Sequence, residues 1–339
     1  MQLNLRKSKL GILLGLMLVF WLAASPAQAF RFVVLADSPH IMDKWPNQAI
    51  NQECLEYIRD QIMGLNPKPD MVFFLGDLVT RAYRSSDQHR FIPDWQEIMS
   101  PLPQNGIKVY VAIGNRDLYG PGGWPPLKQL EGEFKHYFSV TPFAMPDNGP
   151  VNYKRLAYSF TYDNAFFVVL DTFGFKRDGT NWDVGLDEEQ LAWFKNQAQN
   201  SDARFKFVLS HGPALSAEGL WNWKDKPTMK SMWQIMERFN FSAYFCSHEH
   251  IFSRWRIDQS VDPTITRPMT QTLAGTAGAY PDDPSSIKKK ELIKKANIWL
   301  GYNYVVVDVN HGQAVQRAYG VTKETGVYQS KLLDTCTLH

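Results

Sequence analysis

The feature that most constrains the fold is an alternation along the chain between short apolar runs and longer amphipathic stretches. Short apolar runs are typical of buried β-strands, and amphipathic stretches with helical spacing are typical of surface helices. Strands and helices that alternate in this way predict an α/β fold rather than an all-α or all-β one. No internal repeat and no Gly/Ser-rich linker interrupts the pattern, so we expect one domain over residues 30–339.

The pattern also predicts where each element begins and ends. We expect early strands at 32–36, 71–75, 108–113, 157–162, 166–170, 205–209 and 243–246. Candidates at 253–257, 269–273, 302–309 and 314–319 are expected to be consecutive antiparallel strands. Helices are expected at 48–63, 93–99, 187–199 and 228–239. At the start of the third helix, Asp187 and Gln190 have the spacing of a capping box, in which each side chain bonds the backbone N–H of the other residue.

Polar residues gather where five of the expected strands end. In an open α/β sheet, ligands bind in the crevice outside the carboxyl ends of the strands, so clusters far apart in the sequence can meet there. The residues whose side chains suit metal binding are Asp37, Asp77, Asn115, His211, His248 and His250.

These side chains make a donor set of two carboxylates, one amide and three histidines. Such a set favours two divalent or trivalent ions such as Fe, Mn, Zn or Co over a thiolate zinc site or an all-oxygen calcium site. Two other zinc motifs are excluded. Phe252 stands where a His-Glu-x-x-His peptidase needs its second histidine, and Phe252 and Ser253 stand where a metallo-β-lactamase carries Asp and His.

In order and spacing, the clusters resemble those of the calcineurin-like metallophosphoesterase superfamily, which includes purple-acid-phosphatase-like phosphoesterases. The resemblance spans about residues 32–319 and implies an α/β fold of two packed mixed β-sheets flanked by helices, a four-layer αββα sandwich with a two-metal site. It is carried by Asp37, Gly76-Asp77-Leu78-Val79, Gly114-Asn115-Arg116-Asp117, Ser210-His211-Gly212-Pro213 and His248-Glu249-His250.

The family pattern implies a role for each of the candidate ligands. Asp77 would bridge both metal ions, Asp37 and His250 would complete the first site, and the second site would use Asn115, His211 and His248. The implied reaction is hydrolysis of a phosphoester by a metal-bound hydroxide, without a covalent enzyme intermediate. Two ions about 3.5 to 4 Å apart lower the pKa of a shared water and orient the phosphoryl group.

One departure from the family pattern concerns the first metal ion. The family normally supplies a further ligand through an Asp-x-His motif, but in Asp37-Ser38-Pro39-His40 the histidine comes one residue later. Either His40 reaches the metal from a reshaped loop, or this metal has one protein ligand fewer. The sequence leaves both alternatives open.

The second departure is Arg116, which stands where the family usually has a histidine that interacts with phosphate. Arginine stays charged, so Arg116 can hold phosphate oxygens but cannot act as a titrating acid. Asp117 would orient Arg116; alternatively, Arg116 only caps a loop through Asp117. A proton for the leaving group would come from metal-bound water, from His40 or from another loop histidine such as His136, unless the substrate carries a good leaving group.

The first 29 residues are typical of a secretory signal peptide. Three basic residues precede an apolar run at 10–24, which is shorter than the roughly 20 residues of a membrane-spanning helix. The Ala27-Gln28-Ala29 sequence suits signal peptidase. We therefore expect a secreted or periplasmic protein that begins at Phe30, the alternative being an uncleaved N-terminal anchor.

Charge limits the partners that this chain can bind. The chain carries 36 basic and 34 acidic residues, and Arg6, Lys7 and Lys9 leave with the predicted signal peptide, so 33 basic residues then face 34 acidic ones. A nucleic acid held by bulk charge is not expected. We expect a small phosphorylated substrate and no stable membrane anchor after signal cleavage.

The sequence thus predicts an exported two-metal phosphatase acting on phosphomonoesters. Two alternatives remain. One is a phosphodiesterase acting on nucleotides or lipid head groups. The other is a degenerate metal-binding protein that has lost turnover through the changes at Pro39 and Arg116, against which the presence of all six candidate ligands argues.

Overall fold

The structure of the chain, a computed structural model, describes residues 30–40, 49–80, 88–120, 126–173, 184–219, 223, 225–283, 285 and 296–338. The predicted signal peptide, residues 1–29, lies outside the described residues. Among the helices within these ranges, none has both the length and the apolar character needed to span a membrane.

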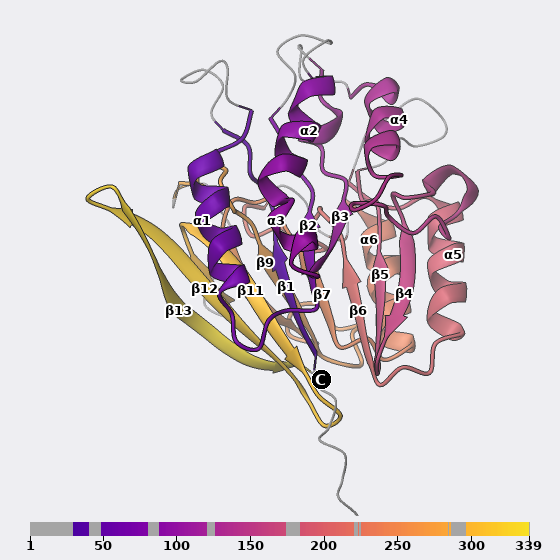
Figure 1. Ribbon diagram of the computed structural model, residues 1–339. Coiled ribbons are helices and arrows are strands. Elements are labelled where there is room, and N and C mark those ends of the chain that lie inside the picture. The colour runs from indigo at the N-terminus through magenta and orange to yellow at the C-terminus, as the bar shows by residue number, and fades with distance from the viewer. Residues whose placement is uncertain are drawn as a thin grey trace, which may run out of the picture.

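The first of two mixed β-sheets has six strands in the order β13-β12-β11-β1-β2-β3 (Figure 1). Strands β1 to β3 are parallel, so their carboxyl ends lie at the same edge of the sheet. Strands β11 to β13 extend the other side of β1 in antiparallel pairs. The strands are β1 (Phe30–Leu35), β2 (Met71–Leu75), β3 (Lys108–Ala112), β11 (Tyr302–Val309), β12 (Ala314–Glu324) and β13 (Val327–Leu338).

The second sheet has seven strands in the order β10-β8-β9-β7-β6-β5-β4. Strands β5, β6, β7 and β9 are parallel to one another, and the outer strands pair antiparallel. The strands are β4 (Tyr158–Tyr162), β5 (Ala165–Val169), β6 (Phe205–Leu209), β7 (Ala243–Cys246), β8 (Phe252–Ile257), β9 (Met269–Ala274) and β10 (Ala296–Trp299).

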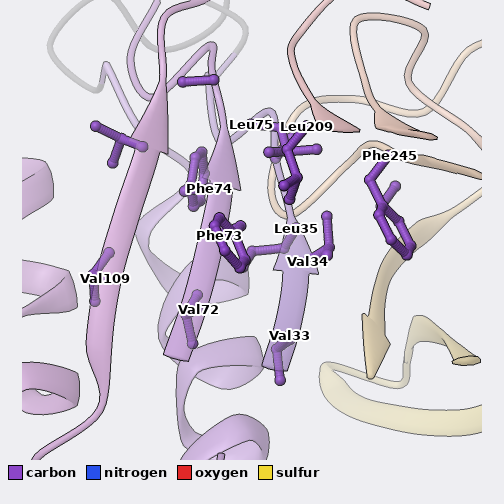
Figure 2. Packing of buried hydrophobic residues seen from close by; sticks show 14 of the residues in the cluster. Val33, Val34, Leu35, Val72, Phe73, Phe74, Leu75, Val109, Leu209 and Phe245 are labelled. Carbon is purple, nitrogen blue, oxygen red and sulfur yellow. The ribbon is translucent and has the colours of Figure 1, made fainter. Parts of the chain in front are cut away.

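Aromatic side chains pack the two sheets face to face. The ring of Phe32 in β1 lies 5.2 Å from those of Phe167 and Phe207 and 5.8 Å from that of Phe245, all three in the second sheet. These four side chains are fully buried, and Figure 2 shows Phe245 and Leu209 beside the strands of the first sheet. Burial of large aromatic groups is strongly favourable, so this core fixes the strand ends of the two sheets relative to each other.

Helices cover the outer faces of both sheets (Figure 1). Leu55 and Ile58 of α1 share the core of the first sheet, whereas Phe194 of α5 and Trp233 of α6 pack against the outer face of the second. The predicted four-layer α/β architecture is therefore confirmed. The helices are α1 (Gln52–Met63), α2 (Gln88–Met99), α3 (Pro101–Gln104), α4 (Lys128–Tyr137), α5 (Glu188–Gln199) and α6 (Pro227–Arg238), with short 3-10 turns η1 (Arg116–Leu118) and η2 (Val151–Tyr153).

One predicted arrangement of strands is wrong. The later strands do not form one consecutive antiparallel series, because β8 and β9 pair in the second sheet while β11 and β12 pair in the first. The sequence pattern also did not indicate β10, β13 or α4. Strand β13 is exposed or half-buried along almost its whole length, so it lacks the apolar run that marks a buried strand.

The predicted capping box at α5 is half correct. The Asp187 carboxylate accepts the backbone N–H of Gln190 at 2.8 Å, as expected of an N-cap. The Gln190 side chain does not return this bond; it bonds the backbone N–H and C=O of Asp171 at 2.8 and 2.9 Å. Gln190 thus ties α5 to the loop that follows β5.

Candidate metal centre

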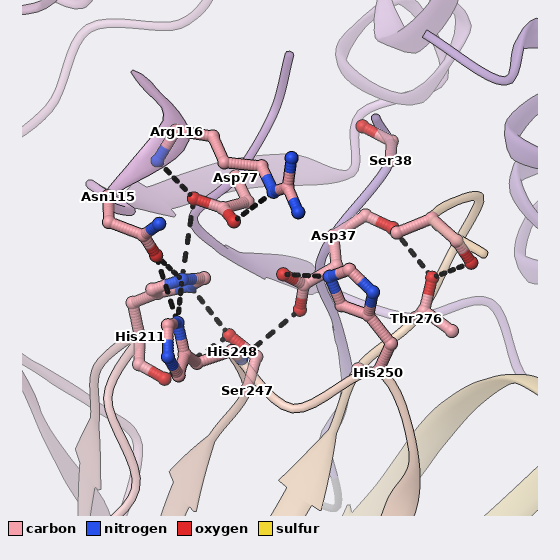
Figure 3. A network of polar contacts seen from close by, with 12 residues as sticks. Asp37, Ser38, Asp77, Asn115, Arg116, His211, Ser247, His248, His250 and Thr276 are labelled. Carbon is pink, nitrogen blue, oxygen red and sulfur yellow. Dashed lines mark hydrogen bonds and ion pairs between the residues drawn. The ribbon is translucent and has the colours of Figure 1, made fainter. Parts of the chain in front are cut away.

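Six polar side chains from loops that follow five strands converge at one edge of the two sheets (Figure 3). The first sheet supplies one side chain after each of β1, β2 and β3, and the second sheet supplies one after β6 and two after β7. The structure therefore brings together all six candidate ligands of the sequence analysis, namely Asp37, Asp77, Asn115, His211, His248 and His250.

Left-handed backbone conformations mark the loops that carry these side chains. Asp37, Asp77 and His248 have φ angles of 56°, 51° and 78°, a region that side-chain-bearing residues adopt at a cost on the order of 1 kcal/mol. Gly76, at φ 86°, has no space for any side chain, because an added Cβ would lie 2.6 Å from the backbone nitrogen of Gly114. The close approach of the β2 and β3 loops therefore requires glycine at this position.

Asp117 holds the β2 and β3 loops together. Its buried carboxylate accepts backbone N–H bonds from Gly114, Asp77 and Leu78 at 2.8, 3.0 and 2.9 Å. Burial raises the pKa of Asp117 to about 7, while these N–H bonds favour its charged form. Asp117 thus fixes the backbone from which Asp77 projects, a role that the sequence pattern did not indicate.

Asn115, His211 and His248 form the tighter part of the cluster. Asn115 Oδ1 lies 3.0 Å from His211 Nε2 and 2.9 Å from His248 Nδ1, and these two nitrogens are 3.3 Å apart. Asp77 Oδ1 lies 3.4 Å from the same His211 nitrogen. This mixed oxygen and nitrogen set fits a transition-metal ion. We call Asp77, Asn115, His211 and His248 the four-ligand position.

A backbone carbonyl fixes which nitrogen of His211 faces the cluster. His211 Nδ1 lies 2.7 Å from the carbonyl oxygen of Leu75 and 2.9 Å from the hydroxyl oxygen of Ser247. A carbonyl oxygen can only accept, so Nδ1 carries the proton of the neutral ring and Nε2 is left to bind a metal. The buried ring is therefore held in the tautomer that a metal ligand needs.

The remaining ligands, Asp37 and His250, lie on the other side of Asp77. His250 Nδ1 lies 3.0 Å from the Tyr280 carbonyl oxygen, and its Nε2 faces Asp37 Oδ1 at 3.8 Å. That Asp37 oxygen is buried and has no hydrogen-bond partner among the described residues. Ligand atoms of Asp37, Asp77 and His211 lie within 4.8 Å of one another. We call Asp37, Asp77 and His250 the three-ligand position; the unsatisfied carboxylate oxygen fits a cation there.

Arg116 contacts the shared carboxylate through two of its groups. Its backbone N–H donates to Asp77 Oδ1 at 2.8 Å, and its side-chain Nε lies 3.4 Å from Asp77 Oδ2. The Arg116 side chain is 38% exposed, whereas that of Asp77 is 1% exposed. The guanidinium thus stands at the open side of the cluster, on the Asp77 oxygen that His211 does not face (Figure 3).

Burial and neighbouring charges set the protonation of these groups. Burial alone would raise the pKa of Asp77, but His211 and Arg116 hold it well below its usual value. Asp77 in turn outweighs burial at His211 and raises its pKa to about 9. Burial lowers the pKa of His248 to about 3 and that of His250 to about 4. His248 and His250 are therefore neutral and able to bind metal, whereas a metal ion must displace a proton from His211.

His40 lies against other elements. With residues of α1 and α2, including Glu53, Glu56 and Glu97, it lines a hollow of about 700 Å³. None of the six candidate ligands lines this hollow. This placement favours the alternative in which the first metal ion has one protein ligand fewer.

Two buried residues support the cluster without a clear signal in the sequence. The Thr276 hydroxyl lies 2.9 Å from the backbone carbonyl oxygen of Asp37 and so holds the β1 loop. Glu249 lies between two candidate ligands, and its carboxylate bonds the Ser216 hydroxyl and the Ala217 N–H, the latter at 2.9 Å. Its position between two histidines was the only hint of this role.

The sequence matches the calcineurin-like phosphoesterase family over residues 30–252. This range includes all six candidate ligands and Arg116. No curated protein matches the chain.

Solved structures share the fold. A purple acid phosphatase from yellow lupin (Lupinus luteus) seeds has a TM-score of 0.65 at 15% identity, covering 92% of this chain and 54% of that one, so our chain spans about half the length of the lupin protein. PhoD has a TM-score of 0.65 at 13% identity, covering 91% and 69%. A dimetal phosphatase from Danio rerio has a TM-score of 0.56 at 13% identity, covering 90% and 99%.

Proposed function

The chain belongs to the calcineurin-like phosphoesterase family, and from this premise we propose that it is an exported phosphatase that hydrolyses phosphomonoesters with two metal ions. The observation that carries the proposal is the convergence of six oxygen and nitrogen ligands on one edge of the sheets. Because loops of both sheets supply these ligands, we further propose that residues 30–339 act as a single catalytic domain.

The two positions would hold one ion each, with Asp77 shared between them. Ions of Fe, Mn, Zn or Co bound there would supply a water of lowered pKa and positive charge for the phosphoryl oxygens. The chain's own contribution is to fix the ligands. Leu75 sets the tautomer of His211, Tyr280 does the same for His250, and Asp117 holds the loop of Asp77.

Arg116 would bind the substrate phosphate. Its side chain is partly exposed beside the cluster and carries the permanent charge of a guanidinium. A phosphomonoester carries more negative charge than a phosphodiester, so a fixed cation at this place favours the monoester. A diester of a nucleotide or lipid head group is the alternative substrate.

A metal-binding protein without turnover is the second candidate function. The contact between Arg116 and Asp77 and the place of His40 in the hollow beside α1 and α2 favour it. The complete set of six ligands supports an enzyme instead.

A substrate panel on purified, metal-supplemented protein separates these functions. We expect hydrolysis of aryl and alkyl phosphomonoesters that is lost in Asn115→Ala and kept in His311→Ala, which changes an exposed histidine in the turn between β11 and β12. Hydrolysis of diesters alone would favour the phosphodiesterase. Two bound ions without any hydrolysis would refute the enzyme and leave the binding protein.

Export has a separate test. Ala27-Gln28-Ala29 motivates the proposal that the exported chain begins at Phe30. N-terminal sequencing of protein from the secreted or periplasmic fraction should give Phe30. Recovery of the chain with residues 1–29 in the membrane fraction would contradict export of a cleaved protein.

A further inference from the structure

The two candidate metal positions are unequal in the number and state of their ligands. The four-ligand position has Asp77 Oδ1, one amide oxygen and two imidazole nitrogens. The three-ligand position has Asp37, His250 and Asp77, whose Oδ2 is the oxygen that His211 does not face, while His40 lines the hollow beside α1 and α2. An ion at the three-ligand position therefore has fewer protein donors before any other effect is counted.

A cation of the protein already contacts the shared ligand on this side. Arg116 Nε lies 3.4 Å from Asp77 Oδ2, whereas His211 faces Asp77 Oδ1. A carboxylate can bridge two ions through one oxygen or through both, and one oxygen of Asp77 here faces a guanidinium. An ion at the three-ligand position that binds Asp77 Oδ2 must therefore share this oxygen with Arg116 or displace it, and an ion that binds Oδ1 still lies beside the guanidinium charge.

The charge of Arg116 also acts on the other ligands of this position. Ligand atoms of Asp37 and Asp77 lie within 4.8 Å of each other and His250 faces Asp37, so an ion held by these side chains lies close to the guanidinium. Like charges repel strongly in a buried site where screening is weak. A divalent ion placed beside Asp37 and His250 would thus be repelled by Arg116.

We propose that Arg116 is a built-in competitor of the metal ion at the three-ligand position. The four-ligand position fills first, and the three-ligand position fills only when the guanidinium leaves Asp77. Because its side chain is 38% exposed, Arg116 can turn away from Asp77 and contact a phosphate instead. This inference rests on the proposed two-metal function and adds an order of loading to it.

Binding of Mn²⁺ to the metal-free full chain tests the proposal. Equilibrium dialysis counts the bound ions, and the electron paramagnetic resonance spectrum distinguishes an isolated Mn²⁺ from a spin-coupled pair. For the wild type we expect two separate binding steps, with the pair signal appearing only in the second. In Arg116→Gln the second step should shift to a Mn²⁺ concentration lower by roughly tenfold or more, because the competing charge is gone, while the first step shifts less.

Two further variants locate the effect. Arg256→Gln removes an exposed arginine of β8 and should bind Mn²⁺ like the wild type. Asp37→Asn should abolish the second step and keep the first, since Asp37 belongs to the three-ligand position alone. A second step at the same concentration in the wild type and in Arg116→Gln would overturn the proposal, as would loss of the first step in Asp37→Asn.

Phosphomonoester hydrolysis measured on the same samples separates this inference from the proposed function. Unshifted binding steps in an active enzyme would refute the competitor role and leave the hydrolase. The expected shift in protein that carries two ions but never hydrolyses a phosphoester would support the competitor role and refute the hydrolase.

Discussion

In the proposed mechanism, Arg116 would link metal loading to substrate binding. Its backbone N–H and its side chain contact the two different oxygens of Asp77. Without metal the guanidinium balances a buried carboxylate, and with a substrate present it would balance a phosphate.

Arg116→Ala should therefore slow hydrolysis even at saturating metal. Loss of one charge-assisted contact to the phosphate is expected to raise the barrier by about 2 to 4 kcal/mol, as for removal of a preorganised donor. Arg116→His should instead add a pH dependence and help alkyl esters more than activated aryl esters. The measurement is kcat/KM against pH for one aryl and one alkyl phosphomonoester. Nearly full activity of Arg116→Ala on both esters would show that the metals alone hold the phosphate.

Asp171 provides a residue-scale prediction away from the candidate ligands. Its side chain is buried, one carboxylate oxygen has no hydrogen-bond partner among the described residues, and burial raises its pKa from 3.8 to about 7. The folded state therefore keeps a proton that the unfolded chain releases near pH 4. The stabilising effect of this proton is full below pH 4 and is lost as the pH rises towards 7.

Urea unfolding at pH 4.5 and pH 7 tests whether this contribution to the free energy of unfolding falls as the pH rises. Relative to the wild type, Asp171→Asn should become more stable at the higher pH, by at least about 1 kcal/mol, because it cannot ionise. Asp202→Asn, at an exposed position after α5, should leave the pH dependence of the wild type unchanged. The same difference in free energy of unfolding between the wild type and Asp171→Asn at both pH values would contradict the prediction.

At the scale of elements, the sequence predicts the bounds of strands that consist of a buried apolar run. The strands expected at 71–75, 205–209, 243–246 and 302–309 have the same bounds as β2, β6, β7 and β11. Strand β13 is largely exposed and has no such run. Which later strands share a sheet depends on pairing between distant segments, and no local pattern encodes it.

In the candidate site too, some features were predictable from the sequence and others were not. Its six ligands follow strand ends, and strand ends are predictable. The partners of Arg116, Asp117 and His40 depend on loop conformations, including left-handed residues such as Asp77, and residue spacing does not determine these. The sequence therefore predicted six residues that the structure brings together, but missed that Arg116 contacts Asp77 and that Asp117 bonds three backbone N–H groups.

The β2 loop gives a prediction at this scale. Gly76→Ala adds a Cβ at φ 86° that would lie 2.6 Å from the backbone of Gly114. We expect it to destabilise the fold by about 2 to 4 kcal/mol and to weaken metal binding, because the loops of two ligands must move apart. Gly132→Ala is the matched control. Gly132 lies within α4 with nothing within 4 Å of an added Cβ. The alanine substitution there should therefore stabilise the helix by about 0.5 to 1 kcal/mol.

Unfolding in urea and Mn²⁺ binding, measured on both glycine variants, check this contrast. A Gly76→Ala protein as stable as the wild type would show that the β2 and β3 loops tolerate a wider separation. Reduced stability in Gly132→Ala would show that the helix position is less open than the structure indicates.

At the scale of the whole molecule, the candidate metal centre brings together loops of the two sheets. Asp37, Asp77 and Asn115 come from loops of the first sheet, and the three histidines come from loops of the second. The sheets are otherwise joined by an apolar core around Phe32. Metal bound between their loops would add a second connection at the edge of that core.

Metal should therefore stabilise the whole fold and not only the loops. A ligand that binds the folded state alone adds about 2.7 kcal/mol at a free concentration of about 100 times its dissociation constant. Adding Mn²⁺ to metal-free protein should raise the melting temperature, and EDTA should reverse the rise. In Asp77→Ala, which lacks the carboxylate shared by both positions, most of this rise should disappear, whereas His311→Ala should keep it. Because each comparison is the change within one protein, any effect of the substitution on stability itself cancels. An equal rise in Asp77→Ala would mean that the metal binds elsewhere, and the shared role of Asp77 would then be wrong.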